Sequence, residues 1–189
     1  MIVLAIPRGG IVVAREVADF LDSPLDLIIT RKLGAPGNPE LAVGAVTQEG
    51  VSVLENELIR RLRVPESYLE REAAAQSAEI TRRMRVYRGD RPYPALEGKI
   101  VVIVDDGVAT GSTVRAAILS AREMGSAKVV LAVPVGPRET ISRFAGIADR
   151  VICLDTPEPF YAIGEFYVDF GQVSDETVIR ILESHRADV

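Results

Sequence analysis

The 189-residue sequence contains only one cysteine and one histidine. A single cysteine excludes a disulfide framework within the chain, so stability has to come from a hydrophobic core. The 48% of hydrophobic residues over this length suits one domain with such a core. Cys153 lies in an apolar run at residues 151–154 and is expected to be a small core residue, whereas His185, near the C-terminus, is expected to face solvent.

Long apolar runs and an excess of basic residues are missing as well. No run reaches the roughly 18 apolar residues of a membrane-spanning helix, and we find no signal peptide, so neither a membrane span nor export is supported. The formal net charge of -5 disfavours a broad contact with nucleic acid. The first expected strand is not followed by G-x-G-x-x-G, which excludes a Rossmann-type dinucleotide binder. We therefore expect a cytoplasmic protein whose partners are neither nucleic acids nor membranes.

Short apolar runs alternate with amphipathic helical patterns, which is typical of an α/β fold with a mostly parallel sheet flanked by helices. Strands are expected at residues 2–6, 25–31, 100–104, 128–134 and 150–154. Helices are expected at about 12–21, 65–87, 114–121 and 138–145, and from about 175. We therefore expect one domain over residues 1–189.

Two segments of this domain are expected to stand apart from the sheet. A small flap at about 32–55 is predicted as a Gly- and Pro-rich loop at 32–39, followed by strands at 41–47 and 51–54 around a turn at Glu49 and Gly50. An aromatic hood is predicted at about 157–173. The face of the first helix that covers the sheet is expected to hold Val12, Val13, Val17, Phe20 and Leu21. A solvated face of the long helix is expected to hold Arg82, Arg83 and Arg85.

The most informative stretch begins with the apolar run at 100–104 and continues into a loop. The run ends in Asp105 and Asp106, and the loop that follows is Gly107, Val108, Ala109, Thr110, Gly111, Ser112 and Thr113. This pattern predicts a buried parallel strand that delivers two carboxylates to the start of a helix. Backbone N–H groups, hydroxyls and the positive helix end predict a cradle for one phosphate monoester. Acceptor-only carboxylates beside it suit a sugar diol or Mg²⁺, so a ribose 5-phosphate fits.

The Asp-Asp-Gly sequence alone has a simpler interpretation, a strand end with solvated carboxylates followed by a helix N-cap. The thirteen residues 101–113 are more specific, and they resemble the signature of the type I phosphoribosyltransferases. In that family the acidic pair binds the ribose hydroxyls of phosphoribosyl pyrophosphate (PRPP) and the loop binds its 5-phosphate. The resemblance implies these roles for Asp105 and Asp106, which would also hold Mg²⁺, and for the loop 107–113.

Two further segments resemble parts of the same family. Pro7, Arg8, Gly9 and Gly10 follow the first strand, where the family has a loop that binds pyrophosphate. Arg8 adds a permanent cation for the leaving group, although a plain surface turn is the alternative. Arg31 and Lys32, before Gly34, resemble the start of the family's mobile catalytic loop, and a charged surface loop is the alternative.

The aromatic segment at 160–170 resembles the hood of the purine phosphoribosyltransferases. The resemblance implies Phe160 or Tyr161 as a stacking platform for the base and Asp169 as a base contact, whereas core packing of the rings is the alternative. Two departures concern the base. Ala109 stands where hypoxanthine-guanine enzymes have an acidic residue, and Pro134 stands where they have a base-reading lysine. These departures argue against a 6-oxopurine and leave the base open.

The resemblance implies a Mg²⁺-dependent pentosyltransferase of nucleotide salvage. Such an enzyme transfers the ribose 5-phosphate of PRPP to a nitrogen acceptor, a nucleobase or similar compound, and releases pyrophosphate. Its partners would be these small molecules and, as is common in the family, a second copy in a homodimer. The alternative is a non-catalytic regulator that binds PRPP or a nucleotide on the same fold. The missing base-reading residues favour the regulator, whereas the retained Arg31, Lys32 and Gly-Pro loop favour the enzyme.

Overall fold

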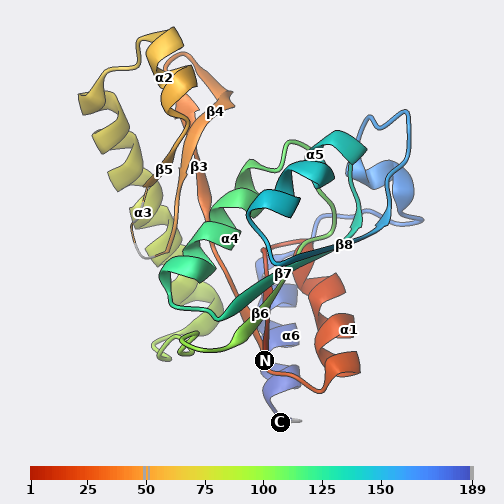
Figure 1. Ribbon diagram of the computed structural model, residues 1–189. Helices are drawn as coiled ribbons and strands as arrows, with labels where there is room; N and C mark the ends of the chain where they lie inside the picture. The colour runs from red at the N-terminus through yellow and green to blue at the C-terminus, as the bar shows by residue number, and fades with distance from the viewer. Residues whose placement is uncertain (49, 51, 188–189) are drawn as a thin grey trace.

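The computed structural model describes residues 1–48, 50 and 52–187 and contains two β-sheets with helices around them (Figure 1). The larger sheet has five parallel strands in the order β2-β1-β6-β7-β8. They are β1 (Ile2–Ala5), β2 (Leu25–Leu27), β6 (Ile100–Val104), β7 (Lys128–Val135) and β8 (Arg150–Asp155). The expected α/β class is confirmed. None of the described helices is long and apolar enough to cross a membrane.

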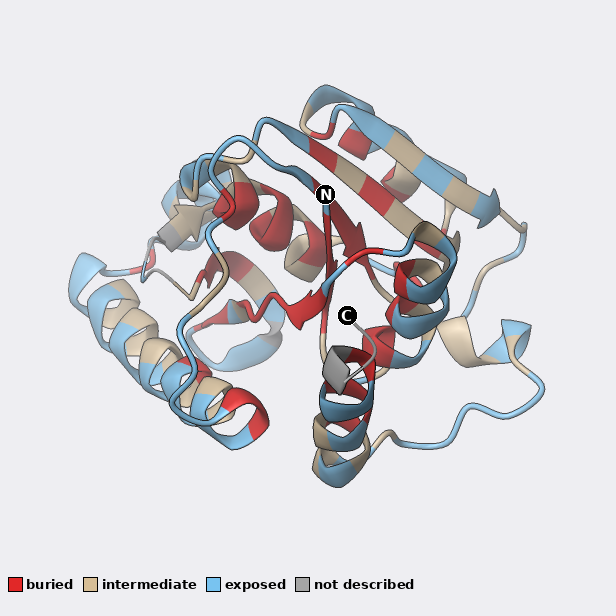
Figure 2. Ribbon diagram, turned by 90° about the horizontal axis from the view of Figure 1, so that it is seen from below, coloured by how far each residue is buried: buried red, intermediate tan, exposed pale blue. Residues whose placement is uncertain are grey.

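Both faces of the parallel sheet are covered, which explains the uninterrupted apolar runs of its central strands. Successive side chains of a strand point to opposite faces. Val3 and Val102 pack in a core cluster with α1 (Gly10–Leu21) and α6 (Asp175–Ala187). Leu4 and Ile103 pack on the other face in a cluster with α4 (Ser112–Glu123) and with the short 3-10 helix η1 (Phe144–Gly146) that follows α5 (Arg138–Arg143). Every residue of β1 is therefore buried, as Figure 2 shows for the strands at the centre of the molecule.

The smaller sheet forms the flap, in which β3 (Arg31–Ala35), β4 (Asn38–Val46) and β5 (Ser52–Leu54) are antiparallel. It is followed by α2 (Asn56–Leu62), which the sequence did not predict, and by the expected long helix α3 (Glu66–Arg88). In Figure 1 this unit extends away from the parallel sheet, with α3 beside β3. The expected turn at Glu49 and the expected strand start at Val51 lie outside the described residues.

The expected loop at residues 32–39 is wrong, because most of this segment is β3 and the start of β4. Leu33 and Ala35 are buried in the cluster that includes Ile80 of α3, so the segment is a strand covered by that helix. The Tyr68 hydroxyl of α3 donates to the Gly34 carbonyl at 3.1 Å. Gly37, with φ at 73°, lies in the turn that joins the two strands. The Gly and Pro residues thus mark a tight hairpin and not a long loop. The strand expected at 25–31 also ends earlier, at Leu27.

The buried face of α1 differs from the expected one. Ile11, Ala14 and Ala18 are fully buried, whereas Val12 is 45% and Phe20 88% exposed. The buried residues follow helical spacing, and the two alanines let the helix approach the sheet closely. The apolar pattern of the sequence therefore predicted the helix correctly, but it predicted part of the buried face of the helix wrongly.

Two single residues also lie differently from expectation. Cys153 is only half-buried, because it belongs to β8 at the edge of the sheet. His185 is buried, not solvent-facing. Its Nδ1 lies 3.0 Å from Asp19 Oδ1, and its Nε2 lies 3.0 Å from the Ser23 carbonyl oxygen. The only histidine therefore fastens α6 to the end of α1.

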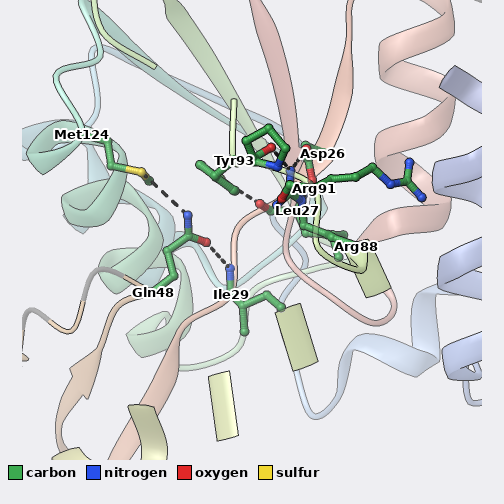
Figure 3. A network of polar contacts seen from close by, with 9 residues as sticks. Asp26, Leu27, Ile29, Gln48, Arg88, Arg91, Tyr93 and Met124 are labelled. Atoms are coloured by element: carbon green, nitrogen blue, oxygen red, sulfur yellow. Dashed lines mark hydrogen bonds and ion pairs between the residues drawn. The ribbon is translucent and has the colours of Figure 1, made fainter. Parts of the chain in front are cut away.

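A buried ion pair fixes the far end of α3 to the parallel sheet (Figure 3). Arg88 donates from Nε and Nη2 to the two carboxylate oxygens of Asp26 in β2, at 2.7 and 3.0 Å. It also donates to the carbonyls of Arg91 and Pro92, and its guanidinium lies 5.0 Å from the centre of the Tyr93 ring. These contacts hold one end of α3, the helix that packs against β3.

Candidate functional site

The two carboxylates at the end of β6 lie side by side and half-buried. The Asp106 N–H donates to Asp105 Oδ1 at 2.9 Å. Burial and the charge of Asp106 raise the pKa of Asp105 well above its usual value, and burial also raises the pKa of Asp106. Ionisation of both carboxylates is therefore unfavourable in the ligand-free protein. A bound cation or hydroxyl donors would stabilise the ionised pair.

The loop between β1 and α1 lies directly against this acidic pair. A Cβ at Gly9 would stand 1.7 Å from Asp106 Oδ2, and one at Gly10 would stand 2.9 Å from the Asp105 Cα. Only glycine allows the loop to approach so closely. The peptide bond between Pro7 and Arg8 is cis. Two segments that the sequence singled out separately, about a hundred residues apart, thus meet at one edge of the sheet.

Arg8 points from this loop toward the start of α6. Its Nη1 lies 3.5 Å from Asp175 Oδ1, and both side chains are about two-fifths exposed, at 41% and 39%. Asp175 also accepts a hydrogen bond from the Tyr87 hydroxyl at 2.8 Å. Since exposed ion pairs are weak, Arg8 can exchange Asp175 for another anion at little cost.

The loop 107–113 connects the acidic pair to α4 and is held from three sides. The Val108 N–H donates to the Val135 carbonyl at 2.9 Å, and the Thr140 hydroxyl donates to the Ala109 carbonyl at 3.0 Å. The Thr30 hydroxyl donates to the Thr113 carbonyl at 3.2 Å. Thr110 is exposed, and α4 begins at Ser112. The first turn of a helix leaves its N–H groups without partners in the helix, so this fixed loop offers them to an anion.

Three cavities surround these elements. The hood cavity, about 320 Å³, is lined by Arg8, Gly9, Val12, Val13, Asp106, Tyr167, Asp169, Phe170, Gly171, Gln172 and Val173. The cationic cavity, about 220 Å³, is lined by Ile6, Pro7, Ile29, Thr30, Arg31, Lys32, Arg83 and Thr113. The flap cavity, about 610 Å³, is lined by Leu41, Ala42, Glu55, Leu58, Thr110, Gly111, Ser112, Arg115, Thr140, Arg143, Phe144 and Ile147. Most of the site residues expected from the sequence line one of the three.

Tyr167 is a residue of the hood cavity that sequence reasoning did not single out. Its hydroxyl donates to the Asp106 carbonyl at 2.6 Å. Burial and the two nearby carboxylates raise the pKa of Tyr167 to about 12, so the hydroxyl keeps its proton. The Phe170 ring lies 5.2 Å from the Tyr167 ring, and Asp169 accepts the Gly171 N–H at 3.1 Å. The aromatic segment was a signal for this position, but it did not show which ring faces the acidic pair.

Phe160 and Tyr161 occupy other positions in the hood. The Phe160 ring stacks on Phe166 of the 3-10 helix η2 (Ile163–Phe166), with centroids 5.4 Å apart and planes 20° apart. Tyr161 is 79% exposed. In the described part of the chain, the rings that line the hood cavity are Tyr167 and Phe170. The stacking role implied for Phe160 or Tyr161 stays a prediction.

Arg31 and Lys32 lie on β3 and line the cationic cavity together with Thr113. The Arg31 Nε donates to Gln76 Oε1 at 2.9 Å, and Gln76 Nε2 donates to Glu72 at 3.0 Å. Burial and the nearby charge of Arg83 lower the pKa of Arg31. Arg83 was expected on a solvated face, yet it lines this cavity. Its position could not be found from the sequence, because it depends on how α3 packs on β3.

The residues that could hold a metal ion at this site are Asp105 and Asp106. Among the described residues, no group of three or more His, Cys, Asp or Glu side chains could hold a metal ion. Mg²⁺ is commonly bound by one or two carboxylates, with the remaining ligands from substrate phosphates and water. Asp105 and Asp106 provide such carboxylates, and a cation there would relieve the charge that raises their pKa values. The donor set therefore fits Mg²⁺ that is held together with a phosphorylated substrate.

Comparison with known proteins gives a consistent result. The model of the phosphoribosyl transferase domain matches residues 1–170. Two Mycobacterium tuberculosis proteins, from strains CDC 1551 and H37Rv, are provisionally named phosphoribosyl transferases, and each is 46% identical over 187 residues. The alignment covers 98% of this chain, which spans 42% of the length of these relatives. The crystal structure of TT1426 from Thermus thermophilus is 47% identical, with a TM-score of 0.85, and the match covers 97% of this chain and 86% of that one.

Proposed function

Because the chain belongs to the phosphoribosyl transferase domain family, we propose that it transfers the ribose 5-phosphate of PRPP to a nitrogen acceptor and releases pyrophosphate. The observation that carries this proposal is the contact between the Gly9–Gly10 turn and the acidic pair. The glycine turn, for which we propose anion binding, contacts two carboxylates, and Pro7 before it lines a cavity together with Thr113 in the first turn of α4. PRPP carries a pyrophosphate at one end of the ribose and a phosphate at the other. It therefore needs two anion sites, with hydrogen-bond acceptors for the ribose hydroxyls between them.

Each part of PRPP then has its own partner in the molecule. The carboxylates of Asp105 and Asp106 accept hydrogen bonds from the ribose hydroxyls, and the N–H groups and hydroxyls of loop 108–113 bind the 5-phosphate. The cationic cavity, with Arg31 and Lys32, binds the pyrophosphate group together with the loop 7–10. The acceptor lies in the hood cavity, where Tyr167 and Phe170 offer aromatic faces for stacking.

The chemistry is a substitution at the anomeric carbon of the ribose. A bond forms from the acceptor nitrogen to this carbon, the carbon–oxygen bond to pyrophosphate breaks, and pyrophosphate leaves with the electron pair. The nitrogen then gives its proton to solvent. Positive charge develops on the sugar and negative charge on the leaving group, so the carboxylates and the cations act on opposite sides of the breaking bond. Mg²⁺, held by Asp105 and Asp106 with substrate oxygens, would add positive charge to the leaving group.

The experiment is a calorimetric titration of PRPP with Mg²⁺, followed on the same sample by a pyrophosphate-release assay. The assay runs through purines, pyrimidines and other nitrogen acceptors. Binding with release for one acceptor supports the transferase and identifies its substrate. Binding without release for any acceptor supports the regulator, the second candidate. Absence of PRPP binding by the folded protein contradicts the transferase and a regulator that binds PRPP.

A further inference from the structure

The wall of the cationic cavity is shared between the flap strand β3 and the long helix α3. Arg31 and Lys32 come from β3, and Arg83 comes from α3, more than fifty residues later. None of the described residues that line this cavity carries a carboxylate. Three cationic side chains around about 220 Å³ therefore converge without an acidic residue in the lining, which is the arrangement of an anion site.

Glu79 lies one helical turn before Arg83 in α3 and forms an ion pair with it. The Arg83 Nε donates to Glu79 Oε1 at 2.8 Å, and Arg82 donates to the same carboxylate from Nε and Nη2 at 2.8 and 2.9 Å. The two arginines lower the pKa of Glu79 to about 2, so this carboxylate stays ionised. Among the described residues, the hydrogen bond of Arg83 uses Nε alone. Both terminal nitrogens of Arg83 are therefore left for a ligand, in the fork that suits phosphate oxygens.

The neighbouring arginine gives a contrast within the same helix. Arg82 binds the same carboxylate but lies 57% exposed, whereas Arg83 is 27% exposed. Arg83 lines the cavity and Arg82 does not. Glu79 would remain paired with Arg82 if Arg83 turned toward a ligand, so the exchange leaves no carboxylate unpaired.

We propose that Arg83 is a further cationic ligand of the pyrophosphate group, presented by α3 and oriented by Glu79. This inference rests on the proposed function, because it assigns a residue to the leaving-group end of the same site. Arg83 contacts the departing phosphate oxygens and stabilises the charge that develops on them, together with Arg31 and Lys32. Glu79 is a positioning residue that acts through Arg83.

The test compares Arg83→Met with Arg82→Met. Both changes remove one positive charge and an ion pair with Glu79, but only the first removes a cation from the cavity. The probes are inorganic pyrophosphate with Mg²⁺ and, separately, ribose 5-phosphate, each titrated by calorimetry. We expect Arg83→Met to weaken pyrophosphate binding by about 10- to 100-fold and Arg82→Met by less than about 2-fold. Ribose 5-phosphate should bind both variants and the wild type alike, since it has no pyrophosphate group.

Each outcome has one meaning. If the wild type binds neither PRPP nor pyrophosphate, the proposed function fails before the variants are compared. If the wild type binds pyrophosphate and the two variants lose the same affinity, Arg83 is not a ligand. A parallel loss of ribose 5-phosphate binding by Arg83→Met also overturns the assignment, because the change would then act on the whole site. Arg83→Lys, which keeps the charge and the helix contacts, should recover part of the pyrophosphate affinity even if the methionine variant folds poorly.

Discussion

Asp105 and Asp106 bring two carboxylates to one half-buried strand end, and this placement has a consequence for stability. The pKa of Asp105 is higher in the folded chain than in the unfolded chain. Such a group favours the folded state at low pH, and this contribution is lost as pH rises through the raised pKa. We predict that Asp105→Asn makes the ligand-free protein more stable than the wild type at pH 8. Thermal unfolding between pH 5 and 9 measures the difference, at about 2–4 °C for each 1 kcal/mol.

Asp90→Asn, at an exposed position after α3, is the matched control for this charge removal. It should leave the pH dependence of the wild type unchanged. The prediction fails if Asp105→Asn and Asp90→Asn shift the melting temperature equally at every pH. The asparagine can still accept the Asp106 N–H through its side-chain oxygen, so the loop geometry is retained.

Gly9 is the residue whose lack of a side chain brings the two loops together. A Cβ there would stand 1.7 Å from Asp106 Oδ2, so Gly9→Ala forces either the loop or the carboxylate to move. A displacement of about 1 Å at a reacting centre can cost on the order of 100-fold in rate. We predict that Gly9→Ala lowers PRPP affinity or turnover to this extent, measured by calorimetry and pyrophosphate release. Gly146→Ala, where a Cβ meets no atom within 4 Å, should retain both.

The ion pair between Arg88 and Asp26 acts at the scale of an element, because it holds the end of α3 on β2. Both side chains are buried, at 5% and 8% exposure. Removal of Arg88 leaves the charge of Asp26 buried without the two hydrogen bonds of the guanidinium, which costs about 3–5 kcal/mol. We predict this loss for Arg88→Met in urea unfolding. Arg91→Met removes a cation whose ion pair with Glu183 is exposed, and should cost less than about 1 kcal/mol.

A second variant distinguishes the cost of leaving a buried charge from the cost of lost packing. The double change Asp26→Leu with Arg88→Met removes both charges, and we expect it to be more stable than Arg88→Met alone. If the double variant is less stable than the single one, Asp26 stabilises the fold through its other contacts, such as the hydrogen bond that its Oδ1 accepts from the Leu27 N–H at 2.8 Å.

The elements that the sequence predicted well are those whose pattern is decided locally. The apolar run of β6 predicts a strand buried on both faces, whatever its position in the sheet. The small residues after it predict the start of a helix. The segment 32–39 was misassigned because its strand character depends on α3, which covers Leu33 and Ala35 from more than thirty positions away. Likewise Arg83 belongs to a charged helical face in the sequence, and only packing on β3 brings it into a cavity.

At the scale of the whole molecule, the site exists because connections from distant parts of the chain meet at one sheet edge. The carboxyl ends of parallel strands lie together, so the order β2-β1-β6 places the loop 7–10 beside Asp105 and Asp106. The sequence predicted these two loops, and the binding roles expected of them stay predictions. It could not predict which ring of the hood approaches Asp106, because the path of residues 156–174 depends on contacts such as the one between Tyr167 and the Asp106 carbonyl.

A ligand that bridges these connections should stabilise the whole domain, because it binds only when they are assembled. We predict that PRPP with Mg²⁺, at about 100 times its dissociation constant, raises the unfolding free energy by about 2.7 kcal/mol. This corresponds to about 5–10 °C in melting temperature for a chain of this size. The double variant Asp105→Asn with Asp106→Asn should fold and show no such rise. A rise of equal size in the double variant would place PRPP away from the acidic pair. Removal of Mg²⁺ by a chelator should reduce the rise in the wild type and leave the double variant unchanged, since only the wild type holds the cation with the substrate.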